Sequence, residues 1–483
     1  MKISIRSIFV VLFGIILVGA NCVNVGSKKI PITASGKEAK EAFLKGLALQ
    51  ENLKGAEALV YFQEAVEKDP NFARAHYNMA LSQPTNKGFF KSLNKAVALA
   101  DRVSEGERLL IQSLEATVNG QTEKQKALVE QLVAAYPEDE RAYMQLGNFY
   151  FGIQDYEKAL AAYEKVVVLA PDFPPVYNQL GYTQRFLNNY EAAEQAFKKY
   201  IELIPDDPNP YDSYAELLLK MGKYEASIKS YQKALEVDAY FIASVVGIAT
   251  DLNLKGTHAK ARATLDAHYP MARNDGERRA LLFANAVSYA DEGDLKSALS
   301  EIKKQYALAE VIDDASAMSG DLFNIGTLYR EMGKYKEAAS AYSQALDIVT
   351  TSSLSDIVKE NTRRGVTYNL ARIDLEEGRI QDAKKKAVAF LDEAELSKNI
   401  NQIRLANQLA GLIAIREKRY DDAVDALNHA NLQNPYNLYY MAQALVKKGD
   451  DKGAAEWAER AVKHNTLNSL NYVLCRHKAE KLL

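Results

Sequence analysis

The sequence reads ERAYMQLG at residues 140–147 and PPVYNQLG at residues 174–181, so Tyr, Gln, Leu and Gly recur after 34 residues. The same shift aligns Pro171 with Pro205, which shows that a whole unit repeats and not one short motif. Further shifts of 34 residues bring more aromatic and small residues into register: Tyr211, Ala215, Gly222, Tyr231, Ala249, Gly256 and Ala261. A fixed period of this length is typical of architectures in which each unit packs mainly on its neighbours.

Each unit contains two segments with helical periodicity. Tyr143, Gly147 and Tyr150 are four and three residues apart, which places them on one face of a first helix. Ala159 and Tyr163, four residues apart, mark the apolar face of a second helix. Gly or Asn residues, which can adopt the left-handed conformation, lie between the two helices and are expected to end the first one: Asn188, Gly222, Gly256 and Gly333.

A helix pair with small residues at the crossing and large aromatics beside them resembles the tetratricopeptide repeat (TPR) family. The resemblance implies an all-α fold, a right-handed α-solenoid of about twelve helix-turn-helix repeats. We assign repeats with mostly a 34-residue period to residues 37–272 and repeats with longer helices or turns to residues 273–466. Residues 467–483 are predicted to form a capping helix that covers the last repeat.

The spacing of the repeats is stretched in the C-terminal half of the chain. The extra residues fall around 311–316 and 350–355. Longer helices with longer turns explain this spacing, and a hinge or a binding insertion is the alternative.

The composition argues against several classes of protein. With 48% apolar and 25% charged residues, the chain is a folded protein, and its net charge of −3 gives no indication of nucleic-acid binding. Cys22 and Cys475 are the two cysteines, too few for a disulfide framework or a multi-cysteine metal site. We therefore expect no cofactor, no metal and no nucleic-acid partner.

No catalytic motif stands out in the sequence. The six histidines form no His-Glu-x-x-His pair, and no phosphate-binding Gly-rich loop or Gly-x-Ser-x-Gly elbow is present. Cys475 and His477 lie close in sequence, but residues at i and i+2 point apart on a helix, so they cannot act as nucleophile and base. The protein is predicted not to be an enzyme.

The N-terminus has the features of an export signal. Lys2 and Arg6 precede an apolar run of about a dozen residues, shorter than the roughly 20 that span a bilayer. Residues 1–21 are therefore predicted to be a signal peptide, and an uncleaved anchor is the alternative. This places the protein in the periplasm or cell envelope.

The residues that follow the apolar run suggest how the signal ends. Gly19-Ala20-Asn21-Cys22 resembles a bacterial lipobox, which implies that Cys22 is lipidated and holds the protein on a membrane, although Asn21 replaces the usual small residue. Ordinary cleavage after Ala20 is the alternative. Residues 22–36 show no apolar period and contain Gly, Ser and Pro, so they are predicted to be a tether.

A partner is expected in the concave groove of the solenoid. In TPR proteins the first helix of each repeat lines this groove, and the resemblance maps the groove positions to eight residues: Met144, Asn148, Phe151, Asn178, Tyr182, Arg185, Asp212 and Glu216. This mixture of aromatic, amide and charged groups suits a peptide or a partner helix. It is not uniformly basic, so an acidic ligand is not favoured there, and ordinary solvated surface is the alternative. Of the Lys, Asn and Arg clamp with which some TPR domains hold a C-terminal carboxylate, only Asn148 is matched.

The predicted function is a non-catalytic protein–protein interaction scaffold of the bacterial cell envelope, whose partners are other envelope proteins or peptides. The alternative is an extracellular protein that binds a carbohydrate or another small ligand through groove aromatics. Most of the 28 tyrosines are expected to fill the space between helices instead of binding a ligand.

Overall fold

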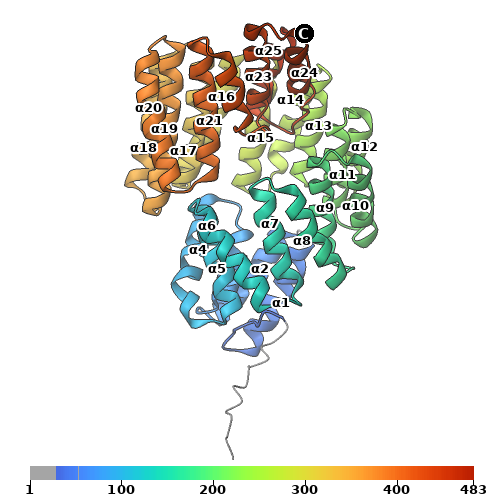
Figure 1. The fold of residues 1–483 in the computed structure, drawn as a ribbon. Helices are drawn as coiled ribbons and strands as arrows, with labels where there is room; N and C mark the ends of the chain where they lie inside the picture. Colours follow the sequence, from blue (N-terminus) through green and yellow to red (C-terminus); the bar gives the residue numbers. More distant parts are fainter. Residues whose placement is uncertain (1–28, 53) are drawn as a thin grey trace, which may run out of the picture.

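The computed structural model describes residues 29–52 and 54–483. Within these residues the secondary structure consists of 25 α-helices and two short 3-10 segments, with no strand. Helices α1 to α24 form twelve consecutive pairs, and α25 follows alone. This confirms the predicted all-α solenoid with about twelve helical hairpins and a single final helix (Figure 1).

The first six pairs consist of helices α1 (Lys37–Glu51), α2 (Gly55–Lys68), α3 (Ala73–Leu81), α4 (Asn86–Leu99), α5 (Glu105–Val118), α6 (Thr122–Ala135), α7 (Glu140–Gly152), α8 (Tyr156–Leu169), α9 (Pro174–Phe186), α10 (Tyr190–Leu203), α11 (Asn209–Lys220) and α12 (Tyr224–Val237). The remaining helices are α13 (Ile242–Leu254), α14 (His258–His268), α15 (Asp275–Glu292), α16 (Leu295–Val311), α17 (Ala315–Glu331), α18 (Tyr335–Thr351), α19 (Asp356–Glu376), α20 (Ile380–Leu396), α21 (Ile400–Arg416), α22 (Tyr420–Asn428), α23 (Pro435–Lys448), α24 (Asp451–Val462) and α25 (Leu470–Glu480). The 3-10 segments are Ala100–Arg102 and Tyr269–Met271.

Helix length accounts for the stretched spacing of the second half. Helices α7 to α10 contain 13 or 14 residues, whereas α16 to α21 contain 17 to 21. The connections at residues 312–314 and 352–355 are short. One additional helical turn per helix therefore provides most of the extra residues.

The two helices of a pair pack through a glycine on the first and an aromatic ring on the second. A Cβ atom at Gly181 would lie 2.5 Å from the ring of Phe197, which is fully buried. Gly147 on α7 stands in the same relation to Tyr163 on α8, at 2.3 Å. The prediction that tyrosines fill the core is confirmed for the fully buried ones: Tyr163, Tyr200, Tyr231, Tyr342 and Tyr472.

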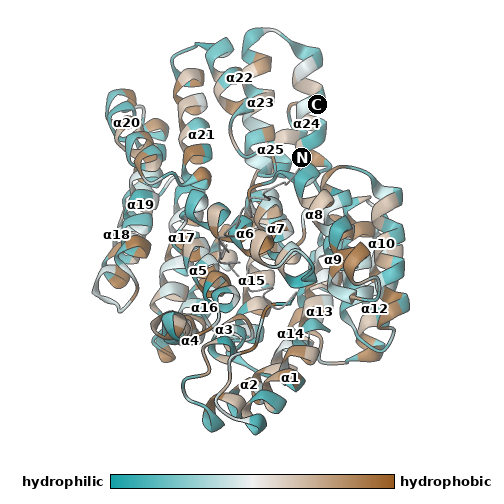
Figure 2. Ribbon diagram, turned by 60° about the horizontal axis from the view of Figure 1, so that its bottom comes forward, coloured by the Kyte–Doolittle hydropathy of each residue, from teal (hydrophilic) through white to brown (hydrophobic). Residues whose placement is uncertain are grey.

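Left-handed residues end the first helix of a pair, as expected. Gly222 has φ = 73° and Asn188 has φ = 60°. Figure 2 shows the result of the helical periodicity: apolar and polar residues alternate along the individual helices and are not separated into different regions. Each helix therefore buries one face and leaves another to solvent.

Odd-numbered helices form the inner layer of the solenoid. Neighbouring odd-numbered helices contact each other directly, for example α11 with α13, α19 with α21, and α21 with α23. In a curved stack the helices on the concave side lie closer together. We call the odd-numbered helices, including α25, the inner helices.

The curvature brings successive turns of the superhelix into contact. Helix α4 packs on α17, and the backbone N–H of Lys87 donates to Asp314 at 2.9 Å. Farther along, the Lys220 ammonium donates to the carbonyl oxygen of His464 at 2.6 Å. In Figure 1 the cyan helices α4 to α6 lie directly below the orange helices of the second turn. We call these contacts between residues about 230 to 250 positions apart the inter-turn seam.

The segment 29–36, at the end of the predicted tether, is extended and lies against the connections between repeats. The backbone N–H of Ile30 donates to Asp139 and that of Ser35 donates to Asp69, both at 2.8 Å. Carboxylates of two different repeats therefore hold this stretch against the first turn. Residues 1–28, with the predicted signal peptide and Cys22, lie outside the described part of the chain.

None of the helices in the described residues combines the length and the apolar character needed to cross a membrane.

Candidate functional site

Three of the predicted groove residues contribute more to packing than to surface. Met144, Asn178 and Asp212 are all buried. Asp212 accepts a hydrogen bond of 2.6 Å from the hydroxyl of Ser244 on α13, which ties two inner helices together. These three side chains therefore expose little surface that a ligand in the groove could contact.

The other predicted groove residues remain at least partly accessible. The Arg185 guanidinium lies 4.7 Å from the centre of the Tyr182 ring and 3.3 Å from a carboxylate oxygen of Glu216. Asn148 is exposed and accepts a hydrogen bond of 2.8 Å from Tyr163. Phe151 is half-buried against other aromatic rings. The structure therefore brings Tyr182, Arg185 and Glu216 together.

A small pocket connects this region to the second turn. It has a volume of about 330 Å³ and lies at the inter-turn seam, where Arg185 and Lys220 face His464 and Arg460. Burial lowers the pKa of Lys220 to about 8, and the charge of Arg185 adds to this effect. The pocket is narrow, and α24 of the second turn covers the groove surface around Arg185.

Asp212 makes stability depend on pH. Burial, and then the charge of Glu216, raise the pKa of Asp212 to about 8, far above the value of about 3.9 in an unfolded chain. Between these values the folded state binds a proton that the unfolded state does not, so this contribution to stability is lost as the pH rises from 4 to 8.

We expect Asp212→Asn to stabilise the protein at pH 8 by roughly 1–3 kcal/mol, since the amide keeps the acceptor for Ser244 without a buried charge. The gain should disappear near pH 4. Urea denaturation at both pH values measures it, with exposed Asp206→Asn as the control. A gain that does not change with pH would contradict the assignment.

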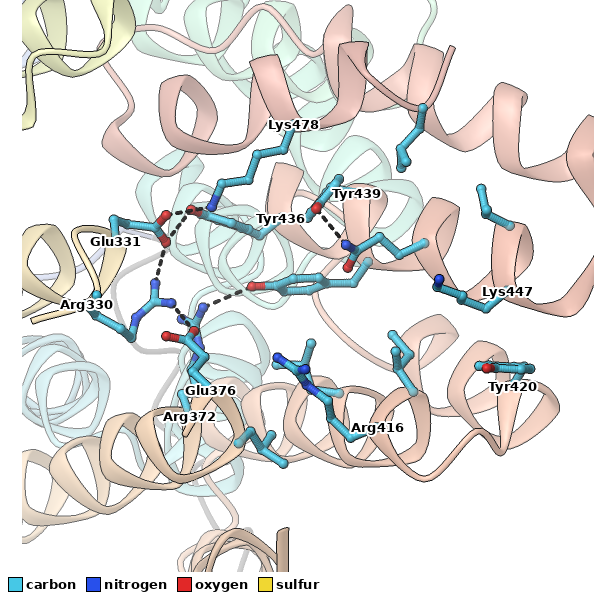
Figure 3. Close-up of a pocket in the computed structure, with 18 of the residues that line it drawn as sticks. Arg330, Glu331, Arg372, Glu376, Arg416, Tyr420, Tyr436, Tyr439, Lys447 and Lys478 are labelled. Carbon is cyan, nitrogen blue, oxygen red and sulfur yellow. Dashed lines mark hydrogen bonds and ion pairs between the residues drawn. The ribbon is translucent and has the colours of Figure 1, made fainter. Parts of the chain in front are cut away.

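A larger pocket lies on the inner face of the second half of the solenoid. Its volume is about 980 Å³, and inner helices α17, α19, α21, α23 and α25 line it together with the turns that follow them (Figure 3). Six basic and two acidic side chains line the pocket, a net charge of +4 when all are ionised. The lining also contains Tyr335, Tyr420, Tyr436, Tyr439 and Tyr440.

A network around Glu331 forms one wall of the pocket. The carboxylate of Glu331 accepts hydrogen bonds from Arg330 (2.8 Å), Tyr436 (2.8 Å) and Lys478 (2.6 Å). Arg330 also pairs with Glu376. Burial raises the pKa of Glu331, but Arg330 and Lys478 lower it by more, so the carboxylate is charged at neutral pH. These ion pairs and hydrogen bonds join α17, α19, α23 and α25.

Arg372, in the same pocket, forms no ion pair, although the charge of Glu376 is close enough to help raise the pKa of its guanidinium. Its guanidinium donates to the hydroxyl of Tyr440 at 3.0 Å and lies 5.8–5.9 Å from the rings of Tyr368 and Tyr436. The Nε atom is buried without a hydrogen-bond partner. The described residues provide no carboxylate that forms an ion pair with it. Arg372 is a cation that the protein leaves only partly compensated.

The open side of the pocket carries further unpaired cations. Arg416 is the last residue of α21, Lys418 lies in the turn after it, and Lys447 lies in the last turn of α23. All three are exposed, and none forms an ion pair with a described residue. Figure 3 shows Arg416 and Lys447 on different helices, both beside the open space.

Sequence reasoning missed this pocket because it placed the groove where the repeat motif is cleanest. The cations that meet here come from five different inner helices and one turn, and they occupy no motif position. A basic residue near the C-terminal end of the first helices α17, α19, α21 and α23 is the signal that points to it.

Other candidate chemistry in the described chain is limited. Cys475 is fully buried, and burial raises the pKa of its thiol to about 12. His477 instead contacts Glu480 at 2.7 Å and the carbonyl of Asp291, so cysteine and histidine are not brought together. No group of three or more potential metal ligands occurs in residues 29–52 and 54–483.

Comparisons with known proteins agree with the helical repeats. Family models described as tetratricopeptide repeat match residues 140–173, 174–207, 209–241 and 322–348. The chain is 25% identical over 140 residues to outer dynein arm-docking complex subunit 4 of Xenopus laevis, and the match covers 29% of this chain and only 25% of that relative. Among solved structures it is similar to PilW, a widely conserved type IV pilus biogenesis factor, with 18% identity and a TM-score of 0.33. That match covers 44% of this chain and 95% of the other.

Proposed function

Because the chain carries tetratricopeptide repeats, we propose that it is a non-catalytic scaffold of the bacterial cell envelope that binds a peptide or a partner helix on its inner face. The observation that carries this proposal is the pocket of about 980 Å³ between α17, α19, α21, α23 and α25. It is large enough for several residues of a partner, and its tyrosines and charged groups are typical of protein interfaces.

The chemistry of this pocket supports binding more than catalysis. Its two carboxylates, Glu331 and Glu376, pair with Arg330, so neither is free to accept a proton from a substrate. The thiol of Cys475, with its raised pKa, has little nucleophilic thiolate at neutral pH. The groups that remain free are cations, which bind and orient anionic groups.

The envelope location rests on the sequence features of residues 1–22: a cationic start, an apolar run and Cys22 at the expected end of a signal. A lipid on Cys22 would hold the solenoid at a membrane and leave the inner face available to other envelope proteins.

The test is crosslinking in intact cells, followed by mass spectrometry of the partners and of the protein's own N-terminal peptide. We expect a reproducible envelope protein that is lost from the Arg416→Glu variant. Lys385→Glu is the matched control, because Lys385 is exposed on the outer helix α20. A lipidated or trimmed N-terminal peptide confirms export.

One outcome would contradict the scaffold function, and another would contradict the proposed export. Recovery of no protein partner, together with a shift of the melting temperature by carbohydrate alone, would favour the sugar-binding alternative. An intact N-terminus starting at Met1 would contradict cleavage of a signal peptide.

A further inference from the structure

Each of five successive inner helices contributes a cation to the large pocket. The five residues are Arg330 of α17, Arg372 of α19, Arg416 of α21, Lys447 of α23 and Lys478 of α25. Arg330 and Lys478 are neutralised by Glu331 and Glu376, whereas the three between them are not. An uninterrupted row of three helices therefore presents unpaired positive charge to the same cavity.

The position of Arg372 is the strongest indication of an anionic ligand. A buried charge is costly unless it is paired and hydrogen-bonded. Arg372 has one hydrogen bond of 3.0 Å, to a neutral hydroxyl, and its Nε–H donates to nothing. It is also packed between tyrosine rings, which hold the guanidinium in place. A carboxylate in the pocket would satisfy the missing donor and the missing charge together.

Arg330 points to the same conclusion. Its side chain is only 4% exposed, and its Nε atom is buried and without a partner although both terminal nitrogens form ion pairs. Burial and the nearby charge of Arg372 oppose its ionisation, but the charges of Glu331 and Glu376 more than offset them and raise the pKa of Arg330. Arg330 therefore supports an anionic ligand only through its unpartnered Nε–H, which lacks an acceptor.

A favourable interaction with the helix dipole explains only some of the cations in this row. Arg416 and Lys447 lie in the last turns of their helices, where cations interact favourably with the helix dipole. Arg372, in contrast, is four residues before the end of α19 and is directed at Tyr440 across the pocket. The dipole therefore does not explain why a partly compensated cation is retained there.

The spread of the charges favours a peptide over a small anion. Packed helices are about 8–10 Å apart, so unpaired cations on three successive inner helices cannot all contact one small molecule. An extended peptide places alternate side chains about 6.5–7 Å apart on one side, which suits such a row. Apolar residues between the cations, such as Leu412, Ile415 and Val446, offer contacts to uncharged side chains of the same peptide.

We infer that this pocket binds an acidic peptide segment of a partner protein, with one carboxylate paired to Arg372 and others to Arg416 and Lys447. The inference rests on the proposed scaffold function and names the chemistry of its partner. It differs from the sequence-based expectation for the N-terminal groove, whose mixed residues are not uniformly basic and do not favour an acidic ligand.

Fluorescence anisotropy with two labelled peptides tests the inference on the full chain. One peptide alternates Glu with Leu over eight residues, and the matched peptide has Gln in place of Glu. We expect the Glu peptide to bind at least about tenfold more tightly at low salt, with the difference shrinking as salt rises. Arg372→Gln and Arg416→Glu should each weaken its binding about tenfold.

The control is Arg363→Gln on the same helix, because Arg363 is outside the pocket and paired with Glu360 and Glu393. Far-UV circular dichroism shows whether Arg372→Gln folds, and exposed Arg416→Glu keeps the test valid if it does not. Equal binding of both peptides, or no effect of either pocket substitution, would overturn the inference. Tighter binding of a twelve-nucleotide single-stranded DNA than of the Glu peptide would also overturn it.

Failure of the inference is distinguishable from failure of the scaffold proposal. If crosslinked partners persist in cells that express the Arg372→Gln or the Arg416→Glu variant, the protein is a scaffold that binds its partners outside this pocket. If no partner is recovered from cells with the unmodified protein, the scaffold proposal itself fails.

Discussion

Replacement of Asp291 by alanine is expected to destabilise the C-terminal end of the solenoid by about 3–5 kcal/mol. The side chain of Asp291 on α15 is completely buried and accepts two hydrogen bonds, of 2.8 and 3.0 Å, from Arg476 on α25. His258 contacts the same carboxylate at 3.0 Å. Without Asp291, the largely buried guanidinium of Arg476 loses its counter-charge, and α25 loses its attachment to the inner layer.

Reactivity of Cys475 reports this local opening directly. In the folded protein the thiol is fully buried on α25, so a maleimide should react with it slowly. We expect labelling in a Cys22→Ser background to be much faster in Asp291→Ala, and urea denaturation to show the loss of stability. A local readout is preferable because a twelve-repeat array need not unfold in one step.

The matched control is Asp421→Ala, which also removes an ion pair, with Lys448 at 2.6 Å, but one whose carboxylate is 81% exposed. It should cost no more than about 1 kcal/mol. Equal labelling rates in both variants would mean that Asp291 does not hold α25 in place.

The second large effect is expected from Gly181→Leu, which should destabilise the protein by roughly 1–3 kcal/mol through overpacking. A Cβ atom at this position would already lie 2.5 Å from two ring atoms of Phe197. Phe197 is fully buried in the crossing of α9 and α10, so its ring cannot move without a shift of the helices. Chemical denaturation measures the loss.

Gly320→Leu is the matched control, since Gly320 is exposed on α17 and a Cβ atom there would meet nothing within 4 Å. Leucine has a higher helix propensity than glycine, so this variant should be neutral or more stable by less than about 1 kcal/mol. Similar destabilisation by both substitutions would show that the close packing of Gly181 on Phe197 does not stabilise the helix pair.

The repeat architecture was predictable because it depends on contacts that are local in sequence. Gly181 and Phe197 are 16 residues apart, and Gly147 with Tyr163 and Gly326 with Tyr342 repeat this spacing and contact. A small residue and an aromatic ring must face each other wherever two helices cross so closely. Both residue types therefore recur at the same positions of successive repeats. The number of helix pairs and the left-handed turn residue Gly222 followed from the same pattern.

The groove residues were harder to predict because the motif identifies the helix but not the burial of each position. Asn178 and Asp212 are on inner helices as expected, yet neighbouring helices bury them. Their burial depends on how closely successive pairs stack and on what the next turn covers. A single repeat read in isolation contains neither of these facts.

The helix pairs, their order and their packing follow from the residue pattern alone, because these contacts join residues within one or two repeats. The folded chain was needed to see how successive turns meet at the inter-turn seam, where Lys87 contacts Asp314, and how Arg372, Arg416 and Lys447 come to share one cavity. These contacts depend on curvature, which is the sum of small rotations between neighbouring repeats. No single motif encodes that sum, so contacts between residues hundreds of positions apart appear only once the whole chain has been folded.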